Sequence, residues 1–452
     1  ETQQEQRLAH QLRAGQAALA AGRIDQPPND SAWFYFRGVL DVAPDNVVAQ
    51  QGLDEVQNTL IERAIEYAHE LDFESADRVL EDASLVTESP ERIAAARREI
   101  RGFRAQRMAE LEARAVAAMD EADFGRAERI LVELVALGNA GNTVNELRRR
   151  MEEARVYGGF RPGQVLRDNF LTRGLWTPDS VVVLAGSYIM GSPVFEKGRA
   201  ESEGPEHRVT FRRGFAIGKT EVTVGQFREF VNQTDYRTQA EQHGFSMIYH
   251  HSSGRLARRD GVNWRNSYDG GEAKETEPVL HVSWNDASAY VTWLARGTGK
   301  SYRLPSEAEF EYALRGRRSN RYWWGDEAPQ RVVENLTGER DVSRGDRQWS
   351  TYFKGYGDGF WGPAPVGSFE PNPFGLHDMA GNVAEWVSDC WHDTYLRAPD
   401  DGSAWINPGC ERRVIRGGYW ASRPDQARSA SRLSARPERR DARVGFRIAR
   451  DL

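Results

Sequence analysis

The distribution of glycine divides this chain into two regions. Residues 1 to about 155 contain few glycines, are rich in Ala, Glu, Arg and Leu, and repeat apolar residues at three- and four-residue spacing. That spacing predicts amphipathic helices. After Tyr157-Gly158-Gly159 the chain changes to Gly, Pro, Trp and short β-type runs, which marks a domain boundary. We therefore expect an all-α helical-hairpin domain over residues 1–155, a linker over 156–174 and an α+β domain over 175–452.

The helical region contains two similar segments. Asp72 and Asp123, which lie 51 residues apart, each follow an apolar helical run and precede a Phe and a small Ala. We expect each copy to end one helix at an acidic turn, pack the Phe back and let the next helix approach at the Ala. A degenerate first copy runs from Ala17 to Leu40. The pattern resembles tetratricopeptide-type hairpins with a longer period, and such hairpins often bind peptides; the alternative is that these residues only form a core.

Composition limits the possible classes of function. The 452 residues are 39% hydrophobic and 28% charged, with a formal net charge of −7, which is typical of globular proteins. No long basic stripe interleaved with aromatics is present, so we expect no nucleic-acid partner. Val181–Leu184 is far shorter than the ~20 apolar residues that cross a bilayer. The first residue is Glu rather than Met, which leaves open the removal of a signal peptide or an N-terminal anchor.

The two cysteines, Cys390 and Cys410, flank a turn-rich loop that contains Pro399, Gly402 and Pro408. This placement favours a disulfide, which would stabilise the fold by about 3 kcal/mol on the chain-entropy account. Disulfides persist in oxidising compartments, so the pair predicts a periplasmic or secreted location. The alternative is a pair of buried thiols in a cytosolic protein.

Eight ordered blocks fill the second region. They are Gly186–Ser192, Glu203–Val209, Phe215–Thr223, Pro278–Ala287, Tyr302–Ala313, Gly375–Trp386, Arg416–Trp420 and Val444–Arg447. In this order they resemble the formylglycine-generating enzyme (sulfatase-modifying factor) family, from about Leu175 to Leu452. The resemblance implies a C-type-lectin-like fold with a core of aromatics and buried ion pairs.

The resemblance also implies structural calcium at two sites. Carried over by position, one site would use Asn335, Leu336, Asp358 and Phe360, and the other Asp378, Gly381, Val383 and Glu385. Calcium takes six to eight oxygen ligands, and carboxylates and backbone carbonyls of glycine-rich loops supply them. The alternative is that these acidic residues cap turns or pair with arginines.

Catalytic relatives carry two copper-binding cysteines after the Arg-Gly-Gly block, and this chain has Ser422 and Ala427 there instead. Soft thiolates hold Cu(I), so we expect no copper and no catalytic residues. Tyr419 also replaces a family serine, and Cys390 and Cys410 precede this segment. An iron site of the ergothioneine-pathway branch is not expected either, because the helical region has only the distant His10 and His69. No neighbouring base supports Ser422 as a nucleophile.

What remains is a candidate ligand-binding pocket floored by Trp420, Ser422, Arg423, Asp425 and Arg428. Arginines beside aromatics suit carboxylates or polar peptides; alternatively, these arginines form internal ion pairs. The leading hypothesis is a non-catalytic binding or scaffold protein with a protein or peptide partner. Two others stay open: a metal-dependent oxidoreductase of the same superfamily, and a lectin-like module that binds glycans.

Overall fold

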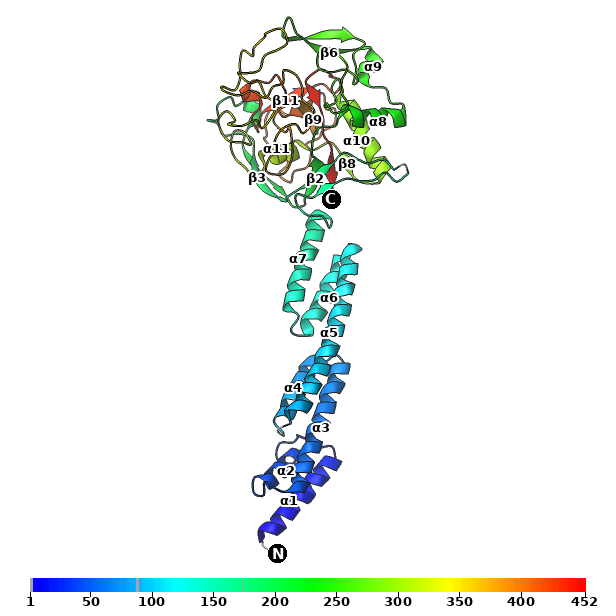
Figure 1. Cartoon of the computed structure of the whole chain (residues 1–452), viewed down its shortest axis with the longest axis vertical. Coiled ribbons are helices and arrows are strands. Elements are labelled where there is room, and N and C mark those ends of the chain that lie inside the picture. The colour runs from blue at the N-terminus through cyan, green and yellow to red at the C-terminus, as the bar shows by residue number, and fades with distance from the viewer. Residues whose placement is uncertain (1–2, 87–88, 173) are drawn as a thin grey trace. The chain divides into compact units, whose positions relative to one another are not determined.

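The structure, a computed structural model, describes residues 3–86, 89–172 and 174–452. It separates into two compact units, and the boundary along the chain lies between Arg155 and Val156. The first unit, blue to cyan in Figure 1, is entirely helical where described, and the second, green to red, mixes helices and short strands. The predicted fold class, an all-α region followed by an α+β domain, is confirmed.

Seven helices build the first unit within the described residues. They are α1 (Gln3–Ala20), α2 (Ala32–Leu40), α3 (Val47–His69), α4 (Phe73–Ser84), α5 (Pro90–Asp120), α6 (Phe124–Ala136) and α7 (Gly141–Tyr157), which ends two residues into the second unit. Small buried residues such as Ala64, Ala76 and Ala127 allow neighbouring helices to approach. The unit therefore has a continuous core along its helices.

The two predicted acidic turns have the same local structure. Asp72 is the N-cap of α4 and accepts a hydrogen bond from the Ser75 amide, and Asp123 is the N-cap of α6 and accepts one from the Arg126 amide. A short polar side chain at this position satisfies an amide that the helix leaves unpaired. The sequence prediction of a helix end, an acidic turn and a new helix is confirmed at both places.

Arg104 and Arg155 make equivalent contacts with α4 and α6, the helices that begin at the two acidic turns. Arg104 lies 5.0 Å from the Phe73 ring centroid and 2.6 Å from Asp77. Arg155 lies 5.3 Å from the Phe124 ring and 2.7 Å from Glu128. A guanidinium can combine a contact to an aromatic face with an ion pair to a carboxylate.

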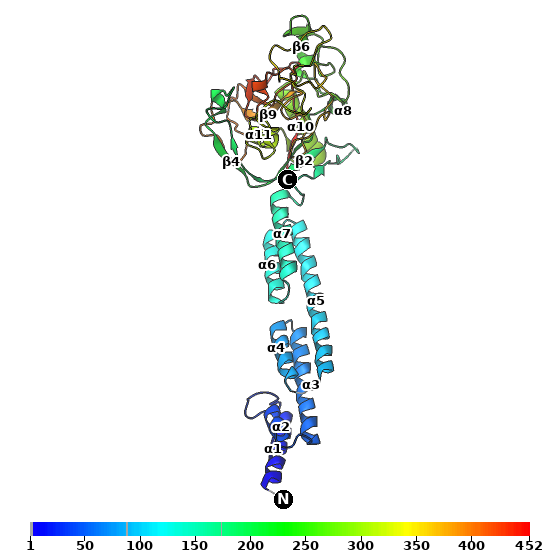
Figure 2. The same ribbon diagram turned by 60° about the vertical axis from the view of Figure 1, so that its left-hand side comes forward.

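Helix α5 contacts both the α3–α4 hairpin and helix α6. Its first half packs against α3 and α4, and its second half packs against α6, as Figures 1 and 2 show. The helix is 31 residues long, or about 46 Å at 1.5 Å per residue. Buried Ile93 and Ile100 serve the first contact, and Leu111 and Met119 serve the second.

Short strands form four small sheets in the second unit. The five-stranded sheet has the order β1 (Val165–Leu166), β2 (Ser180–Val183), β5 (Phe215–Gly218), β13 (Ala449–Asp451) and β8 (Tyr302–Arg303), and the four-stranded sheet the order β11 (Arg432–Ala435), β10 (Arg413–Arg416), β9 (Ala384–Cys390) and β12 (Val444–Gly445). Two hairpins complete the set: β3 (Gly186–Met190) with β4 (His207–Phe211), and β6 (Phe245–His250) with β7 (Arg255–Asp260). The first and last strands of the unit share a sheet.

Helices of this unit begin at capping boxes. They are α8 (Val224–Thr234), α9 (Gln239–His243), α10 (Trp284–Thr298) and α11 (Glu307–Arg315), with short 3₁₀ turns at Glu201–Glu203 and Pro424–Gln426. Thr223 caps α8, which follows strand β5 in the chain. Ser306 and Glu309 make the same reciprocal pair of bonds at α11, which satisfies two otherwise unpaired amides.

Cys390 and Cys410 form a disulfide, as predicted. It joins the end of β9 to the loop that precedes β10, so it closes the turn-rich segment between two paired strands. Across the described residues, no helix combines the length and apolar character that a membrane-spanning segment requires.

Candidate functional site

The positions that correspond to the catalytic cysteines are buried and hold no thiol. Ser422 is 1% exposed; its hydroxyl accepts a hydrogen bond from the Tyr419 amide at 2.9 Å. Thr337 donates to the Ser422 carbonyl at 2.8 Å. Ala427 is also 1% exposed and packs with Tyr322 and Phe353. These two side chains have structural roles in a packed segment.

Aromatic rings gather beside this segment. Trp420 is 1% exposed and donates from its indole to the Ala442 carbonyl at 3.1 Å. Tyr249, Tyr268 and Trp349 surround it, with ring centroids 4.8–6.0 Å away. Trp349 in turn stacks on Trp361 at 3.8 Å. Such ring contacts bury large apolar areas, so they fill the space next to Ser422.

The five residues of the predicted pocket have different environments. Trp420, Ser422 and Arg428 are buried, whereas Arg423 and Asp425 form an outer ion pair 3.3 Å apart. Arg428 binds Glu196 at 2.7 Å and Glu203 at 2.5 Å. The five side chains therefore do not share one environment. The charge of Arg428 is already balanced by Glu196 and Glu203.

A second buried network joins α11 to the sheet around β10. Arg432 makes two bonds to Glu307, at 2.6 and 2.9 Å, and Arg416 contacts both Glu307 and Glu311. Removing one partner of such a buried guanidinium–carboxylate pair leaves the other charge uncompensated and destabilises the fold. This network positions the segment that follows β10.

Asp389 lies buried next to this network with an unusual proton affinity. Its carboxylate accepts hydrogen bonds from the Glu307 and Trp405 amides at 2.7 Å each. Burial, followed by repulsion from the Glu307 carboxylate, raises the pKa of Asp389 from its usual 3.8 to about 7. Between about pH 4 and 7 the folded protein therefore holds a proton there that the unfolded chain has released.

This proton predicts a dependence of stability on pH. Since the folded pKa of Asp389 lies above the unfolded one, the free energy of unfolding should fall as pH rises from about 4 to 7, by up to about 4 kcal/mol. Asp389→Asn should reduce this slope in urea titrations between pH 5 and 8, even though the amide offers one acceptor fewer. Asp400→Asn, at an exposed position in the loop that follows β9, is the control. Equal slopes in wild type and Asp389→Asn would contradict the assignment.

Three buried carboxyls, those of Glu221, Glu334 and Glu385, interact electrostatically with Asp378 of the second predicted calcium site. Glu221, Glu334, Asp378 and Glu385 are at most 1% exposed, and Arg447 is the guanidinium that binds Glu385, at 2.7 Å through both oxygens. Burial raises the pKa of all four carboxyls, that of Glu334 to about 8 with repulsion from Asp378 as the second cause. The cluster carries more acidic groups than one arginine can balance.

Several oxygens of this cluster are available for a cation. Asp378 Oδ2 accepts from the Gly367 amide at 2.7 Å, while Asp378 Oδ1, Glu221 Oε2 and Glu334 Oε2 are buried without a hydrogen-bond partner. A Cβ at Gly381 would lie 2.4 Å from the Asn335 carbonyl oxygen. Buried acceptors without donors are costly, so these residues fit a bound cation or protons.

The first predicted calcium site is organised around Asp358. Its carboxylate accepts from the Leu336 and Phe360 amides at 2.7 and 2.9 Å, and its pKa is raised to about 7 by burial and then by Asp341. Asn335 Oδ1 is buried without a partner. In residues 3–86, 89–172 and 174–452, no three His, Cys, Asp or Glu side chains are grouped to hold a metal. A calcium ion at either site would depend on backbone carbonyls as well.

Glu221, Glu334 and Asp341 are three buried or half-buried acidic residues that were not predicted from the sequence. Glu221 lies inside the block Phe215–Thr223, and Glu334 directly precedes Asn335. An acidic residue directly before the apolar Val222, in a block that begins with the apolar run Phe215-Ala216-Ile217, could have drawn attention to Glu221. Asp341 has no such local signal, because only the fold brings it to the amides of Asp358 and Gly359.

Comparisons with known proteins agree with the fold of the second unit. Residues 170–452 match the family described as sulfatase-modifying factor enzyme 1-like domain. Formylglycine-generating enzyme of Mus musculus is 33% identical over 307 residues, which cover 60% of this chain and 74% of the mouse protein. A protein called inactive C-alpha-formylglycine-generating enzyme 2, also of Mus musculus, is 33% identical over 298 residues, or 60% of this chain and 85% of that protein.

A solved structure gives the same result. The structure of PvdO from Pseudomonas aeruginosa is 35% identical in sequence, with a TM-score of 0.50, and the match covers 65% of this chain and all of that one. The family match spans well over half of the residues and includes every block of the second unit. The chain belongs to the sulfatase-modifying factor enzyme 1-like family.

Proposed function

We propose that this protein is a non-catalytic binding or scaffold protein whose formylglycine-generating-enzyme-like domain and helical region bind protein or peptide partners. The observation that carries the proposal is the pair Ser422 and Ala427, a hydrogen-bonded hydroxyl and a packed methyl group at the two positions of the catalytic thiols. Neither side chain can hold Cu(I), which needs soft sulfur ligands. The two cysteines of the chain are bonded to each other elsewhere in the domain.

The relatives support a degenerate member without deciding the question. One mouse relative carries the name inactive C-alpha-formylglycine-generating enzyme 2, and another, at the same identity, is called formylglycine-generating enzyme. Family membership alone is therefore compatible with both outcomes. The identity of the side chains at the site favours the inactive one.

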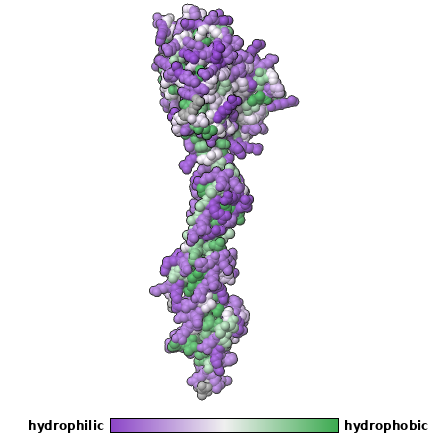
Figure 3. All heavy atoms as spheres, turned by 90° about the vertical axis from the view of Figure 1, so that its right-hand side faces the viewer, coloured by the Kyte–Doolittle hydropathy of each residue, from purple (hydrophilic) through white to green (hydrophobic). Residues whose placement is uncertain are grey.

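The helical region offers surface for a partner. Val132, Val135 and Leu85 expose 54–70% of their area, and Figure 3 shows hydrophobic patches between hydrophilic ones on one face of this unit. A cavity of about 580 Å³ lies where α5 begins, lined by Pro90, Ile93 and Arg97 among others. Apolar surface with charged edges is typical of protein-binding sites.

Metal content and thiol oxidation test the proposal. We expect the purified full chain to contain no stoichiometric copper or iron and to leave a cysteine-containing peptide unoxidised in air. The variant Ser422→Cys/Ala427→Cys is the positive control, because it restores two thiols and should gain Cu(I) binding. Stoichiometric copper or iron in the wild type, or oxidation of the peptide, would favour the oxidoreductase alternative.

Calcium is part of the proposal as a structural ion. Asn335, Leu336, Asp358 and Phe360 would hold one ion, and Asp378, Gly381, Val383 and Glu385 the other. Support comes from the unpartnered buried oxygens of Asn335 and Asp378. Calcium accepts carboxylate, amide and carbonyl oxygens in flexible geometry. Bound calcium would balance the excess of carboxylates described above.

A periplasmic or secreted location is proposed as well. The disulfide between Cys390 and Cys410 supports it, because such bonds are rare in reducing compartments. Mass spectrometry of native protein alkylated without reductant should recover the two cysteine peptides as one linked pair. Two freely alkylated cysteines would remove this support.

A further inference from the structure

Strand β3 has one unpaired edge. Among the described residues β3 pairs with β4 alone, in antiparallel register from Gly186 opposite Phe211 to Met190 opposite His207. In an antiparallel pair, alternate residues of each strand direct their N–H and C=O groups away from the partner. The middle of β3 therefore presents free backbone donors and acceptors on the side opposite β4.

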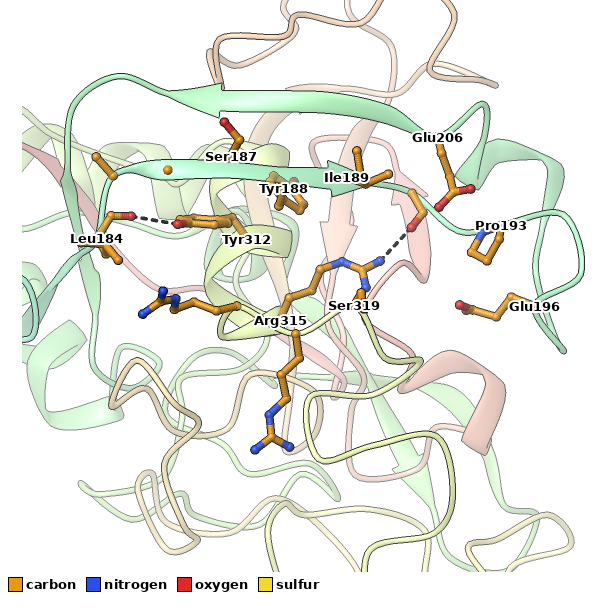
Figure 4. A pocket seen from close by; sticks show the side chains of 15 residues that line it. Leu184, Ser187, Tyr188, Ile189, Pro193, Glu196, Glu206, Tyr312, Arg315 and Ser319 are labelled. Atoms are coloured by element: carbon orange, nitrogen blue, oxygen red, sulfur yellow. Dashed lines mark hydrogen bonds between the residues drawn. The ribbon is translucent and has the colours of Figure 1, made fainter.

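A cavity of about 430 Å³ lies along this edge. Its wall on one side is β3, and on the other the last turn of α11 and the residues after it. Figure 4 shows Tyr312, Arg315 and Ser319 on the side of β3 away from β4, with Leu184 at one end and Glu206 at the other. The cavity is thus a groove between a free strand edge and a helix end.

Side chains of α11 close both ends of the free edge and leave its middle open. Tyr312 donates to the Leu184 carbonyl at 3.0 Å, and Arg315 donates to the Gly191 carbonyl at 2.7 Å. The Gly191 amide donates to Glu311 at 2.9 Å. Between these bonds β3 offers five residues, or about 17 Å of strand at about 3.4 Å per residue. An extended peptide segment of four or five residues fits this length.

The groove carries cations that are not engaged. Arg317 and Arg318 line it, both are exposed, and within the described part of the chain neither guanidinium has a hydrogen-bond or ion-pair partner. Arg317 lies near the Tyr312 hydroxyl, which it influences electrostatically. Guanidinium groups bind carboxylates in a planar, two-bond geometry. One end of the groove is therefore suited to an acidic side chain.

Apolar surface continues past the other end. Pro193 lines the groove, and the next two residues, Val194 and Phe195, are 85% and 87% exposed. Glu196 is already bound to Arg428. Adjacent apolar side chains so fully in water are a feature that a partner can cover.

We propose that β3 binds an extended acidic segment of a partner protein by strand addition, with an Asp or Glu of that segment at Arg317 and Arg318. In this mode main-chain hydrogen bonds supply affinity and side-chain contacts supply specificity. The inference rests on the proposed function, for which it names a site and a class of partner. Neither Ser422 nor Ala427 lines this groove.

Peptide selection on the full chain tests this inference. A display library of random eight-residue peptides should yield binders that carry Asp or Glu. The best of them, synthesised with both ends blocked, should lose at least about tenfold in affinity for Arg317→Glu/Arg318→Glu, since like charges repel. Methylation of alternate peptide nitrogens should abolish binding, because it removes the donors that pair with a strand edge.

The matched control is Arg212→Glu/Arg213→Glu, which reverses an adjacent pair of exposed arginines in the turn between β4 and β5. It should bind the peptide as the wild type does. Binding that ignores the first variant, tolerates methylation or requires a free C-terminus would overturn the inference, as would a library without acidic binders. A dimer of this chain that Arg317→Glu/Arg318→Glu dissolves would place a second copy on β3 instead. None of these results bears on copper or thiol oxidation, so the proposed function is judged separately.

Discussion

Replacing Arg447 with Met is expected to lower the free energy of unfolding of the second unit by about 3–5 kcal/mol. Arg447 is fully buried and binds both oxygens of Glu385 at 2.7 Å, and it also donates to the carbonyl of Gly218 at 3.0 Å. Removing one partner of a buried pair leaves the other charge without compensation. The neighbouring buried carboxyls of Glu221, Glu334 and Asp378 offer Glu385 no positive charge in its place.

Urea unfolding followed by tryptophan fluorescence measures this loss, because Trp33 is the single tryptophan of the helical unit and the other 12 of 13 lie in the second. Arg423→Met is the matched control: its ion pair with Asp425 is exposed, so we expect a change below about 1 kcal/mol. Arg447→Lys keeps the charge and serves if the Met variant does not fold. A loss below about 1 kcal/mol for Arg447→Met would contradict a carboxylate cluster that depends on this residue.

Chelation of calcium is expected to lower the thermal midpoint of the second unit by roughly 5–10 °C and to leave the helical unit unchanged. An ion present at about 100 times its dissociation constant stabilises the native state by about 2.7 kcal/mol, and about 1 kcal/mol corresponds to roughly 2–4 °C in a domain of this size. One ion would compensate Asn335 Oδ1 and the other Asp378 Oδ1, which are both buried without partners.

Scanning calorimetry with and without excess chelator gives the two transitions, and elemental analysis gives the bound ion. Added Ca²⁺ should restore the midpoint, whereas Mg²⁺ should not, because it requires a smaller and more regular set of oxygens. An unchanged midpoint together with no bound calcium would show that the family's calcium sites are absent from this chain.

The sequence predicted those parts of the fold that depend on neighbouring residues. The acidic turns at Asp72 and Asp123 could be predicted because they depend on neighbouring residues: each aspartate caps an amide only three residues away. The same comparison, extended along the chain, would have found Arg104 and Arg155, which also stand 51 residues apart. Their role depends on Phe73 and Phe124, which lie on other helices.

The candidate site could be predicted only in its chemistry. Ser422 and Ala427 were readable as replacements for thiols, but their burial depends on Thr337, 85 residues earlier, and on aromatics from a separate loop. Of the carboxylate cluster, Asp378 and Glu385 were predicted. Glu221 was not, because its contact with Asn382 spans 161 residues of sequence. The block Gly186–Ser192 carried part of the family resemblance, whereas the free edge of β3 and the approach of Arg315 to Gly191, 124 residues earlier, are properties of the tertiary fold.

Helix α5 contacts α3 and α4 with its first half and α6 with its second half. The number of residues between these contacts therefore sets the rotation of α6 about the α5 axis relative to α3 and α4. Each residue of an α-helix advances it by about 1.5 Å and turns it by about 100°. Gly102 stands near the middle of α5, exposed and with free space around its α-carbon. One residue inserted there would turn α6 about the α5 axis by about 100° relative to α3 and α4. The residue count along α5, rather than the loops, therefore fixes the angle at which this unit presents its two hairpins.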